Sequence, residues 1–287
     1  MKKEPLDVAI EAAKTAGHEL LSHLGRATLL HFKEPNSPVT KQDLSAEELI
    51  VSLLRHHFPE HAFLTEERGH VKTNATYRWH IDPLDGTKNY LHGYPHFAVS
   101  LALERVGELL LAVVYDPIAD ELFTAQRNGG GYLNGQRISV SKTTELTGSL
   151  LATNFHNEDP SDPDSNTWHW MRFMGTAQGV RSDGSAALDL CYVAAGRLDG
   201  FWSLKVKPWD LAAGVLMVGE ADGLVTDRHG EPFGLSGKSV LATNGQIHTT
   251  MVQMLGHHDS GDLAQSALVG IVEVQDEHSV HTFREFA

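Results

Sequence analysis

The segment Trp79–Thr87 contains two aspartates after an apolar start, and their spacing suits a binding site for a divalent cation. The segment reads Trp-His-Ile-Asp-Pro-Leu-Asp-Gly-Thr, so Pro83 and Leu84 separate Asp82 from Asp85. Because successive strand side chains point to opposite faces, the two carboxylates converge only if Pro83 and Leu84 turn the chain. The turn also frees the Leu84 carbonyl as an oxygen ligand of the kind magnesium prefers. Taken alone, the segment fits a capped turn equally well, since Asp-Pro and Asp-Gly are common in loops.

The next three residues predict a place for phosphate beside this cation site. Gly86, Thr87 and Lys88 follow Asp85 directly. We expect them to open a helix, and the first N–H groups of a helix have no partner within it and can bind phosphate oxygens. Cations and phosphate would then meet at one strand end.

Acidic residues at two distant positions extend the pattern. Glu66 and Glu67 end the apolar stretch Phe63–Thr65, and Asp210 begins a predicted helix over Leu211–Ala221. Each has an ordinary explanation, the first as a solvated pair and the second as a helix N-cap. Their occurrence in one chain with Asp82 and Asp85 indicates a carboxylate cluster assembled from three segments. Clustered magnesium ions can neutralise a phosphate ester, acidify a water and stabilise the leaving alkoxide.

The three acidic segments resemble the signatures of the inositol monophosphatase family. They are Glu66-Glu67, Asp82-Pro83-Leu84-Asp85-Gly86-Thr87 and Trp209-Asp210-Leu211-Ala212-Ala213-Gly214. Their order and approximate separations match, and the likeness covers residues 4–256. The resemblance implies a lithium-sensitive, magnesium-dependent phosphatase that is commonly dimeric. It also implies an α+β fold, a layered αβαβα sandwich of the sugar-phosphatase type with two tightly packed halves.

By motif position, the resemblance assigns two magnesium sites that share one ligand. Glu66, Asp82 and the Leu84 carbonyl would hold the first ion. Asp82, Asp85 and Asp210 would hold the second, so Asp82 bridges them.

The resemblance also assigns catalytic roles around the metals. Thr40-Lys41-Gln42-Asp43 is similar to the family's Thr-x-x-Asp, which places Asp43 near a third, weaker ion and its water. Gly86 and Thr87 would bind phosphate through backbone N–H groups. The Thr87 hydroxyl and Glu66 would orient the attacking water, so no covalent phosphoenzyme is needed.

Substrate contacts are implied mainly by the second half of the chain. The segment Arg181–Ala187 is similar to the family's Arg-Ser-x-Gly-(Ser/Thr)-Ala-Ala, so Gly184, Ser185 and Ala186 are expected to line the pocket. Asp85 and Asp210 are expected to face the substrate as well. Ser185 also fits an ordinary helix N-cap, and both roles are compatible.

One departure from the family bears on specificity. Inositol phosphatases of this type usually carry a glutamate seven residues before the aspartate of the third signature, where this chain has Ser203. A serine is shorter and uncharged, so it grips a polyol diol less firmly. Lys205 and Lys207 would suit a substrate with a second phosphate, although solvated lysines explain them more simply.

Two amphipathic helices are expected before the first acidic segment. The first, over residues 6–24, has an apolar stripe composed of Leu6, Ile10, Ala13, Leu20, Leu21 and Leu24. A second helix follows a Pro-containing loop and Asp43, with Ser45 and Glu48 as its capping box. Its apolar face is Leu49, Ile50, Leu53, Leu54 and His57, and Pro59 ends it.

Strands dominate the middle of the chain. Residues 77–82, 97–103, 109–115 and 121–125 have strand-like composition and predict an antiparallel sheet. A further strand near residues 150–154 leads into 156–166, which we expect to be a long surface loop or lid.

In the second half of the chain, predicted strands and helices alternate. It predicts strands near Val180, Phe201, Leu224 and Val240 and helices over 185–195 and 211–221, the rhythm of an α/β layer.

This pattern divides the chain into three parts. We expect an N-terminal half at 1–150 with most metal ligands and a C-terminal half at 151–256 with Asp210 and the substrate contacts. Residues 257–287 form an extension of unknown role, in which 267–274 could form a lone strand.

Composition narrows the class of protein. With 287 residues and 41% hydrophobic content, the chain can bury a sizeable core. A formal charge of -14 disfavours nucleic-acid binding, and no apolar run is long enough to suggest a membrane span or signal peptide, so we expect the cytoplasm. Although there are 18 histidines, His56-His57 and His257-His258 lack the i, i+4 spacing of a zinc site. The only cysteine, Cys191, is expected in the core.

The leading hypothesis is a phosphomonoesterase for inositol monophosphate or a similar sugar phosphate. Fructose 1,6-bisphosphate, histidinol phosphate and 3'-phosphoadenosine 5'-phosphate are alternative substrates of the same chemistry. A different class of hypothesis is an interaction protein that keeps the phosphatase fold. The intact set of expected ligands favours the enzyme.

Overall fold

The computed structural model describes residues 3–71, 75–155 and 165–256, and the described residues up to Gly256 belong to one compact unit. Its larger sheet contains β3 (Ala62–Thr65), β4 (Gly69–Val71), β5 (Tyr77–Asp85), β6 (Ala98–Arg105), β7 (Glu108–Asp116), β8 (Glu121–Gln126), β9 (Gly130–Leu133) and β10 (Gln136–Arg137). The spatial order is β10-β9-β8-β7-β6-β5-β3-β4. From β5 to β10 every pair is antiparallel, as predicted, whereas β3 is a parallel neighbour of β5.

Both faces of this sheet are buried, because alternate residues of its central strands enter two different cores. On β6, Val99 and Leu101 pack under the first two helices, while Ala98 and Ala102 face the second half. This alternation follows from the two-residue period of a strand. It also explains why β6 reads as a continuous apolar run.

The first helix, α1 (Pro5–His23), buries a stripe of mainly small residues against the sheet. The buried set is Val8, Ala9, Ala12, Ala13, Ala16, Gly17 and Leu20. The predicted leucine stripe was partly wrong, because Leu21 is 40% exposed. The close approach of α1 to the sheet decides which face of the helix is buried, since a Cβ added to Gly17 would lie 2.6 Å from the ring of Tyr115. Only small side chains allow the helix this near to β7.

The second helix, α2 (Lys41–His57), begins earlier than the predicted capping box. Thr40 is the N-cap, and the Thr40 backbone N–H donates to the carboxylate of Asp43, at 2.8 Å. The prediction of Ser45 and Glu48 as the box was wrong, because both lie inside the helix. A capping motif needs the N-cap to stand outside the helix, and Thr40 ends a strand. The helix ends at His57, shortly before Pro59 as expected.

A smaller sheet forms the second half. It has five strands in the order β12-β11-β13-β15-β14. These are β11 (Leu150–Thr153), β12 (Gly179–Arg181), β13 (Gly200–Ser203), β14 (Leu224–Thr226) and β15 (Val240–Thr243). β11 is parallel to both of its neighbours, while β15 is antiparallel to both of its own. The four strands predicted after residue 170 are all present, close to their expected positions.

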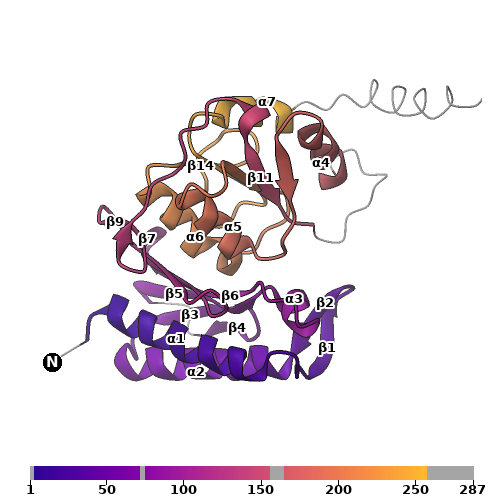
Figure 1. The fold of residues 1–287 in the computed structure, drawn as a ribbon. Coiled ribbons are helices and arrows are strands. Elements are labelled where there is room, and N and C mark those ends of the chain that lie inside the picture. The colour runs from indigo at the N-terminus through magenta and orange to yellow at the C-terminus, as the bar shows by residue number, and fades with distance from the viewer. Residues whose placement is uncertain (1–2, 72–74, 156–164, 257–287) are drawn as a thin grey trace, which may run out of the picture. The chain divides into compact units, whose positions relative to one another are not determined.

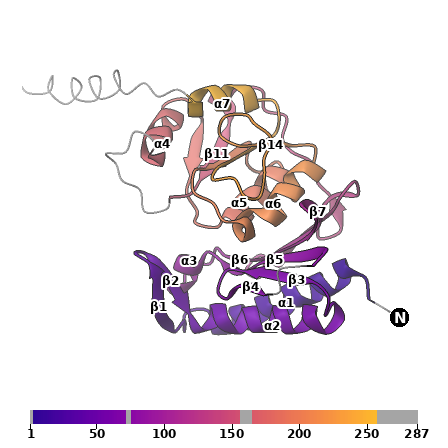
Figure 2. The same cartoon turned by 180° about the vertical axis from the view of Figure 1, so that it is seen from behind.

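Helices complete a five-layer arrangement (Figures 1 and 2). α1 and α2 cover the outer face of the large sheet, and α5 (Ala186–Ala194) and α6 (Pro208–Glu220) lie between the two sheets. α4 (Asn166–Met174) and α7 (His248–Gly256) pack on the far side of the small sheet. The predicted αβαβα sandwich is therefore confirmed. Cys191 on α5 is fully buried, as expected.

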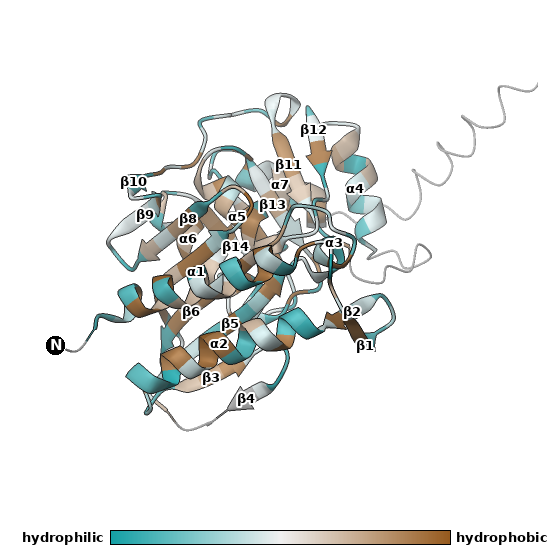
Figure 3. Ribbon diagram, turned by 60° about the horizontal axis from the view of Figure 1, so that its bottom comes forward, coloured by the Kyte–Doolittle hydropathy of each residue, from teal (hydrophilic) through white to brown (hydrophobic). Residues whose placement is uncertain are grey.

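A hairpin missing from the sequence prediction stands beside the end of the large sheet. β1 (Leu29–Glu34) and β2 (Ser37–Thr40) pair in antiparallel fashion around Pro35 and Asn36. In Figure 3, part of this hairpin is brown, which marks hydrophobic residues, although it lies away from the core. Phe32 is 54% exposed. We expected only a loop here, since Pro-Asn signals a turn and β1 lacks a buried face.

Several expectations fall partly or wholly outside the described residues. Of the predicted loop at 156–166, only Ser165 and Asn166 are described, as the N-cap and first residue of α4. The predicted strand at 267–274 and the extension at 257–287 lie outside. A division of the chain near residue 150 remains our proposal; it coincides with the chain's passage from the large to the small sheet. In the part described, no helix combines the length and apolarity needed to cross a membrane.

Candidate active site

A cavity of about 870 Å³ gathers most of the residues named from the sequence. Those that line it are Glu66, Asp82, Leu84, Asp85, Gly86, Thr87, Gly184, Ala186 and Asp210. They come from the ends of β3 and β5 and from the starts of α3 (Thr87–Leu91), α5 and α6. Asp43, Ser185 and Ser203 are fully buried and do not belong to its lining.

A β-bulge brings the two aspartates of β5 to one side of the strand. Asp82 is paired with Ser100 and Asp85 with Ala98, so three steps on β5 match two on β6. In a regular strand, residues three apart point to opposite faces. The extra residue of the bulge brings Asp82 and Asp85 back to the same face. Pro83 tolerates this position because a bulge leaves a residue outside the hydrogen-bond ladder. The sequence predicted a turn here, and the structure replaces it with an irregular strand.

The predicted helix start after Asp85 is present, and Gly86 is required there. Gly86 is the N-cap of α3 with φ of 101°, in the left-handed region that favours glycine. A Cβ at this position would lie 3.0 Å from the carbonyl oxygen of His96. Conformation and space therefore both exclude a larger residue. The helix itself is short, ending at Leu91.

Asp43 connects the start of α2 to the helix that follows the bulge. Its Oδ2 accepts the N–H of Thr40 at 2.8 Å and also the Thr40 hydroxyl. Its Oδ1 accepts the Thr87 hydroxyl at 2.9 Å, and Thr87 also reaches the Leu84 carbonyl at 3.1 Å. Burial raises the pKa of Asp43, an effect that these hydrogen bonds oppose. The side chain of Thr87 is thus oriented from both sides.

Asp85 joins the two halves of the chain. Its Oδ2 accepts the Ser185 hydroxyl at 2.6 Å and the backbone N–H of Ala187 at 2.8 Å. Ser185 is also the N-cap of α5, through the N–H of Leu188. A carboxylate at a helix N-terminus is favoured by the helix dipole. Ser185 is therefore the N-cap of α5, as expected, but it does not line the cavity and contacts it only through Asp85.

Asp210 and Glu66 reach the cavity from distant segments of the chain. Asp210 lies in the first turn of α6, where its Oδ2 accepts the N–H of Lys207 at 3.1 Å. Glu66 follows β3, and its N–H donates to the Ile81 carbonyl of the parallel strand β5 at 3.1 Å. This pairing carries Glu66 to the same strand end as Asp82.

The aspartates that line the cavity have a raised pKa, because burial and the negative charges of neighbouring carboxylates make their ionisation less favourable. Burial, and then the charges of Glu66, Asp85 and Asp210, raise the pKa of Asp82 well above its ordinary value. Burial raises the pKa of Asp85 to about 6, although Ser185 opposes the shift. The pKa of Asp210 is also well above its usual range, because of burial and the charges of Glu66 and Asp85. A cation in the cavity would relieve this repulsion.

The donor set suits magnesium. Carboxylate oxygens and a main-chain carbonyl are the hard ligands that this ion selects. Among the described residues, three side-chain ligand atoms within 4.8 Å of one another occur elsewhere, at His96, Asp183 and Asp189. In the described part of the chain, the cavity carboxylates do not form a group as close as this one.

Two residues around the cavity were missed by the sequence analysis. Lys33 on β1 forms ion pairs with Glu66 at 2.8 Å and Glu67 at 2.7 Å. Asn89 on α3 donates through Nδ2 to two carbonyls, those of His96 at 2.8 Å and Asp183 at 2.7 Å. No spacing rule signals either role, since both depend on segments that meet only in the folded chain.

Ser203, in contrast, lies away from the substrate space. It ends β13, is fully buried, and its hydroxyl donates to the carbonyl of Lys205 at 3.4 Å. Lys205 and Lys207 do line the cavity, together with Leu204 and Val206. The segment after β13, rather than Ser203 itself, therefore faces the space where a substrate would bind.

Comparison with known proteins agrees with this geometry. The model of the inositol monophosphatase family matches residues 1–260. The chain is 41% identical to the Nus factor SuhB of Pseudomonas aeruginosa, covering 88% of this chain and 96% of that protein. It is 40% identical to the inositol-1-monophosphatase of Mesorhizobium japonicum, covering 86% and 94%. The crystal structure of the extragenic suppressor protein suhB of Bartonella henselae superposes with a TM-score of 0.83 at 39% identity, covering 87% of this chain and 97% of that one. With carboxylates from three segments on one cavity, the chain belongs to the inositol monophosphatase family and is a phosphoric monoester hydrolase.

Proposed function

We propose that this protein is a magnesium-dependent phosphomonoesterase that hydrolyses inositol monophosphate or a related small sugar phosphate by attack of water. The observation that carries the proposal is the meeting of Asp82, Asp85 and Asp210 around one cavity. Burial and like charge raise the pKa of all three, which is the environment that a divalent cation stabilises. Relatives called inositol-1-monophosphatase support the substrate class.

The proposed ligands are those that the resemblance assigned. Glu66, Asp82 and the Leu84 carbonyl would hold one ion, and Asp82, Asp85 and Asp210 a second. Bound magnesium would neutralise phosphate oxygens, lower the pKa of a water and stabilise the leaving alkoxide.

The remaining chemistry belongs to the residues around the metal ligands. The Thr87 hydroxyl has acceptors in Asp43 and Leu84, so its own oxygen remains available to accept a hydrogen bond from the attacking water. Glu66, which follows β3, would orient the same water. Gly86 and Thr87 would hold the phosphate through backbone N–H groups, while Gly184 and Ala186 would border the alcohol.

A second candidate substrate class is a sugar or nucleotide bisphosphate. Among the described residues, five lysines line the cavity: Lys33, Lys88, Lys205, Lys207 and Lys238. Lysine side chains at a cavity that also holds carboxylates favour a substrate with a second phosphate. Fructose 1,6-bisphosphate and 3'-phosphoadenosine 5'-phosphate have such a group, whereas inositol monophosphate does not. Histidinol phosphate has only one phosphate and gains less from these lysines.

A third candidate is a role in assembly with other proteins. Several relatives are named Nus factor SuhB, at about 40% identity. We expect any such partner to be a protein, since the formal charge of -14 disfavours direct nucleic-acid binding. Assembly and catalysis are compatible.

Three further properties follow from family resemblance and are proposals of the same kind. We propose that the protein is a homodimer, that lithium inhibits it by occupying a magnesium site, and that it acts in the cytoplasm.

A panel of phosphate esters tests the proposed function. Release of inorganic phosphate is measured with and without magnesium for inositol monophosphate, fructose 1,6-bisphosphate, histidinol phosphate and 3'-phosphoadenosine 5'-phosphate. We expect phosphate release to require magnesium, and kcat/KM to be higher for one class of ester, the monophosphates or the bisphosphates, than for the other. Equal, metal-independent release from every ester would contradict the proposal.

A lysine variant separates the two substrate classes. Lys207→Met removes a cation from the cavity wall but keeps the backbone N–H that donates to Asp210. We expect KM for a bisphosphate to rise several-fold, while KM for inositol monophosphate changes little. An equal rise for both substrates would argue against a second phosphate site there.

A further inference from the structure

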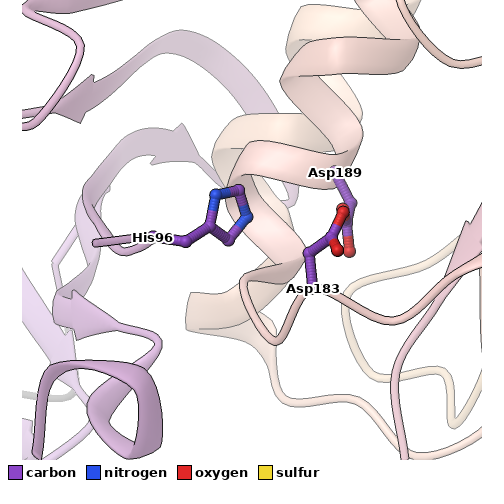
Figure 4. Close-up of side chains that lie close together, drawn as sticks. All are labelled: His96, Asp183 and Asp189. Carbon is purple, nitrogen blue, oxygen red and sulfur yellow. The ribbon is translucent and has the colours of Figure 1, made fainter. Parts of the chain in front are cut away.

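A second group of ligand-type side chains lies outside the cavity carboxylates. His96 precedes β6, Asp183 lies between β12 and α5, and Asp189 is in the first turn of α5. One ligand atom from each lies within 4.8 Å of the others. Figure 4 shows the two carboxylates side by side, with the imidazole ring facing them. None of the three belongs to the metal set assigned by the family signatures.

Asp189 has no satisfactory environment as an isolated carboxylate. Its side chain is 0% exposed, and within the described part of the chain neither carboxylate oxygen has a hydrogen-bond donor. Burial raises the pKa of Asp189, and the charges of Asp183 and Asp85 raise it further. A buried carboxylate beside a second one is destabilising unless a cation or a proton compensates it.

His96 completes a mixed ligand set. Its Nε2 is also buried and has no hydrogen-bond partner among the described residues. Burial lowers the pKa of His96, which favours the neutral imidazole, the form that binds metals. A nitrogen ligand with two carboxylates differs from the all-oxygen set of the cavity. Zinc and manganese accept such mixed ligands more readily than magnesium does.

The loops that carry these side chains are held together independently of any ion. Asn89 Nδ2 donates to the backbone carbonyls of both His96 and Asp183, at 2.8 and 2.7 Å. Gly184 permits this approach, since a Cβ there would lie 3.1 Å from the Asn89 side chain. Two of the three ligands are therefore presented by backbone segments that are held together, as a metal site requires.

We propose that His96, Asp183 and Asp189 form a binding site for one divalent transition-metal ion, of which zinc is the model. Asp183 and His96 are only partly buried, whereas Asp189 is fully buried. The site links the segment before β6 to the first turn of α5. That turn also donates Ala187 N–H to Asp85, so the ion would help to position α5 beside the cavity.

Zinc binding by the full-length chain tests the site once the cavity is disabled. In Asp82→Asn/Asp210→Asn protein, we expect about one equivalent of zinc to remain bound after gel filtration, measured by elemental analysis. Adding His96→Gln should reduce this to a small fraction. Adding His92→Gln, a change at a nearby exposed histidine, should leave it unchanged. No bound zinc in the parent variant, or equal zinc in all three, would overturn the proposal.

A spectroscopic measurement on the unmutated chain guards against variants that fail to fold. X-ray absorption at the zinc edge, with magnesium in excess to fill the cavity, should show imidazole scattering that is lost in His96→Gln. Oxygen-only ligation, or imidazole scattering that persists in that variant, contradicts the assignment. A proton shared between Asp183 and Asp189 would give no zinc binding, so this alternative counts against the proposal.

Discussion

At the scale of single residues, the account depends on side chains that are costly to bury without a cation. Asp82, Asp85 and Asp210 could be selected from the sequence because their types and spacing are unusual together. Lys33 and Asn89 could not, because a single lysine or asparagine has no spacing signature and acquires its role only from partners brought together by folding.

Removing the Thr87 hydroxyl should impair the chemical step. Thr87→Val keeps the shape of the side chain but loses the group between Asp43 and the attacking water. We expect kcat to fall by about 100- to 1,000-fold with little change in KM, as when water loses an orienting group. Steady-state phosphate release gives both constants. Thr87→Ser retains the hydroxyl and should keep most activity, whereas equal losses in both variants would point to packing instead.

Stability of the metal-free protein should depend on Asp85 in a defined direction. Its pKa is raised to about 6, so the unfolded chain releases this proton at lower pH than the folded chain. The resulting destabilisation develops as pH rises from about 4 and is complete above about 6. We therefore expect Asp85→Asn to raise Tm relative to the unmutated protein when both are measured in EDTA at pH 7.5. At pH 5.5 the same substitution should raise Tm by a smaller amount. A larger gain at pH 5.5 would reverse the sign and refute the account.

Elements of secondary structure set how precisely these residues are placed. The bulge in β5 and the left-handed Gly86 put Asp82, Asp85 and Thr87 on one side of the chain. The sequence predicted a turn and a helix start there but not a bulge, because bulges depend on the partner strand. The capping box of α2 was misplaced for a related reason: Thr40 qualifies as an N-cap only once β2 is recognised.

Gly86 should be far less replaceable than a glycine in an open turn. Gly86→Ala adds a Cβ 3.0 Å from the His96 carbonyl and forces a left-handed alanine. We expect a loss of at least about 2 kcal/mol in unfolding free energy, and most of the activity. Gly107→Ala has a similar φ of 84° but open space, so it should cost only about 1 kcal/mol. Chemical denaturation of both variants makes the comparison, and equal costs would mean that the contact is unimportant.

At the scale of the whole molecule, the site exists because two sheets with different topologies are held across α5 and α6. Strand and helix periodicity predicted most elements of both halves, since their apolar faces are buried in the expected way. The order of the layers came from family resemblance, because periodicity does not say which faces meet. The exposed hairpin β1–β2 and the alanine face of α1 escaped prediction, since neither follows the rule that large apolar residues mark the core.

The connection between halves should affect metal binding. Ser185→Ala removes the hydroxyl that binds Asp85 at 2.6 Å and caps α5. We expect a loss of about 1–2 kcal/mol in stability and a several-fold weaker apparent affinity for magnesium. Calorimetric titration with magnesium measures the affinity. Ser185→Thr retains the hydroxyl and should lie close to the unmutated protein; unaltered magnesium binding in Ser185→Ala would argue that Asp85 needs no support from α5.

The most direct test of the proposed active site is the rate of phosphate release from inositol monophosphate or the best ester of the panel, measured against magnesium concentration for the unmutated protein and for Asp210→Asn. The account predicts no release without magnesium, a saturable rise as magnesium is added, and a fall of at least about 100-fold in Asp210→Asn, whose fold is retained. Release that is independent of magnesium, or undiminished in a folded Asp210→Asn variant, would contradict the claim that these carboxylates bind the catalytic ions.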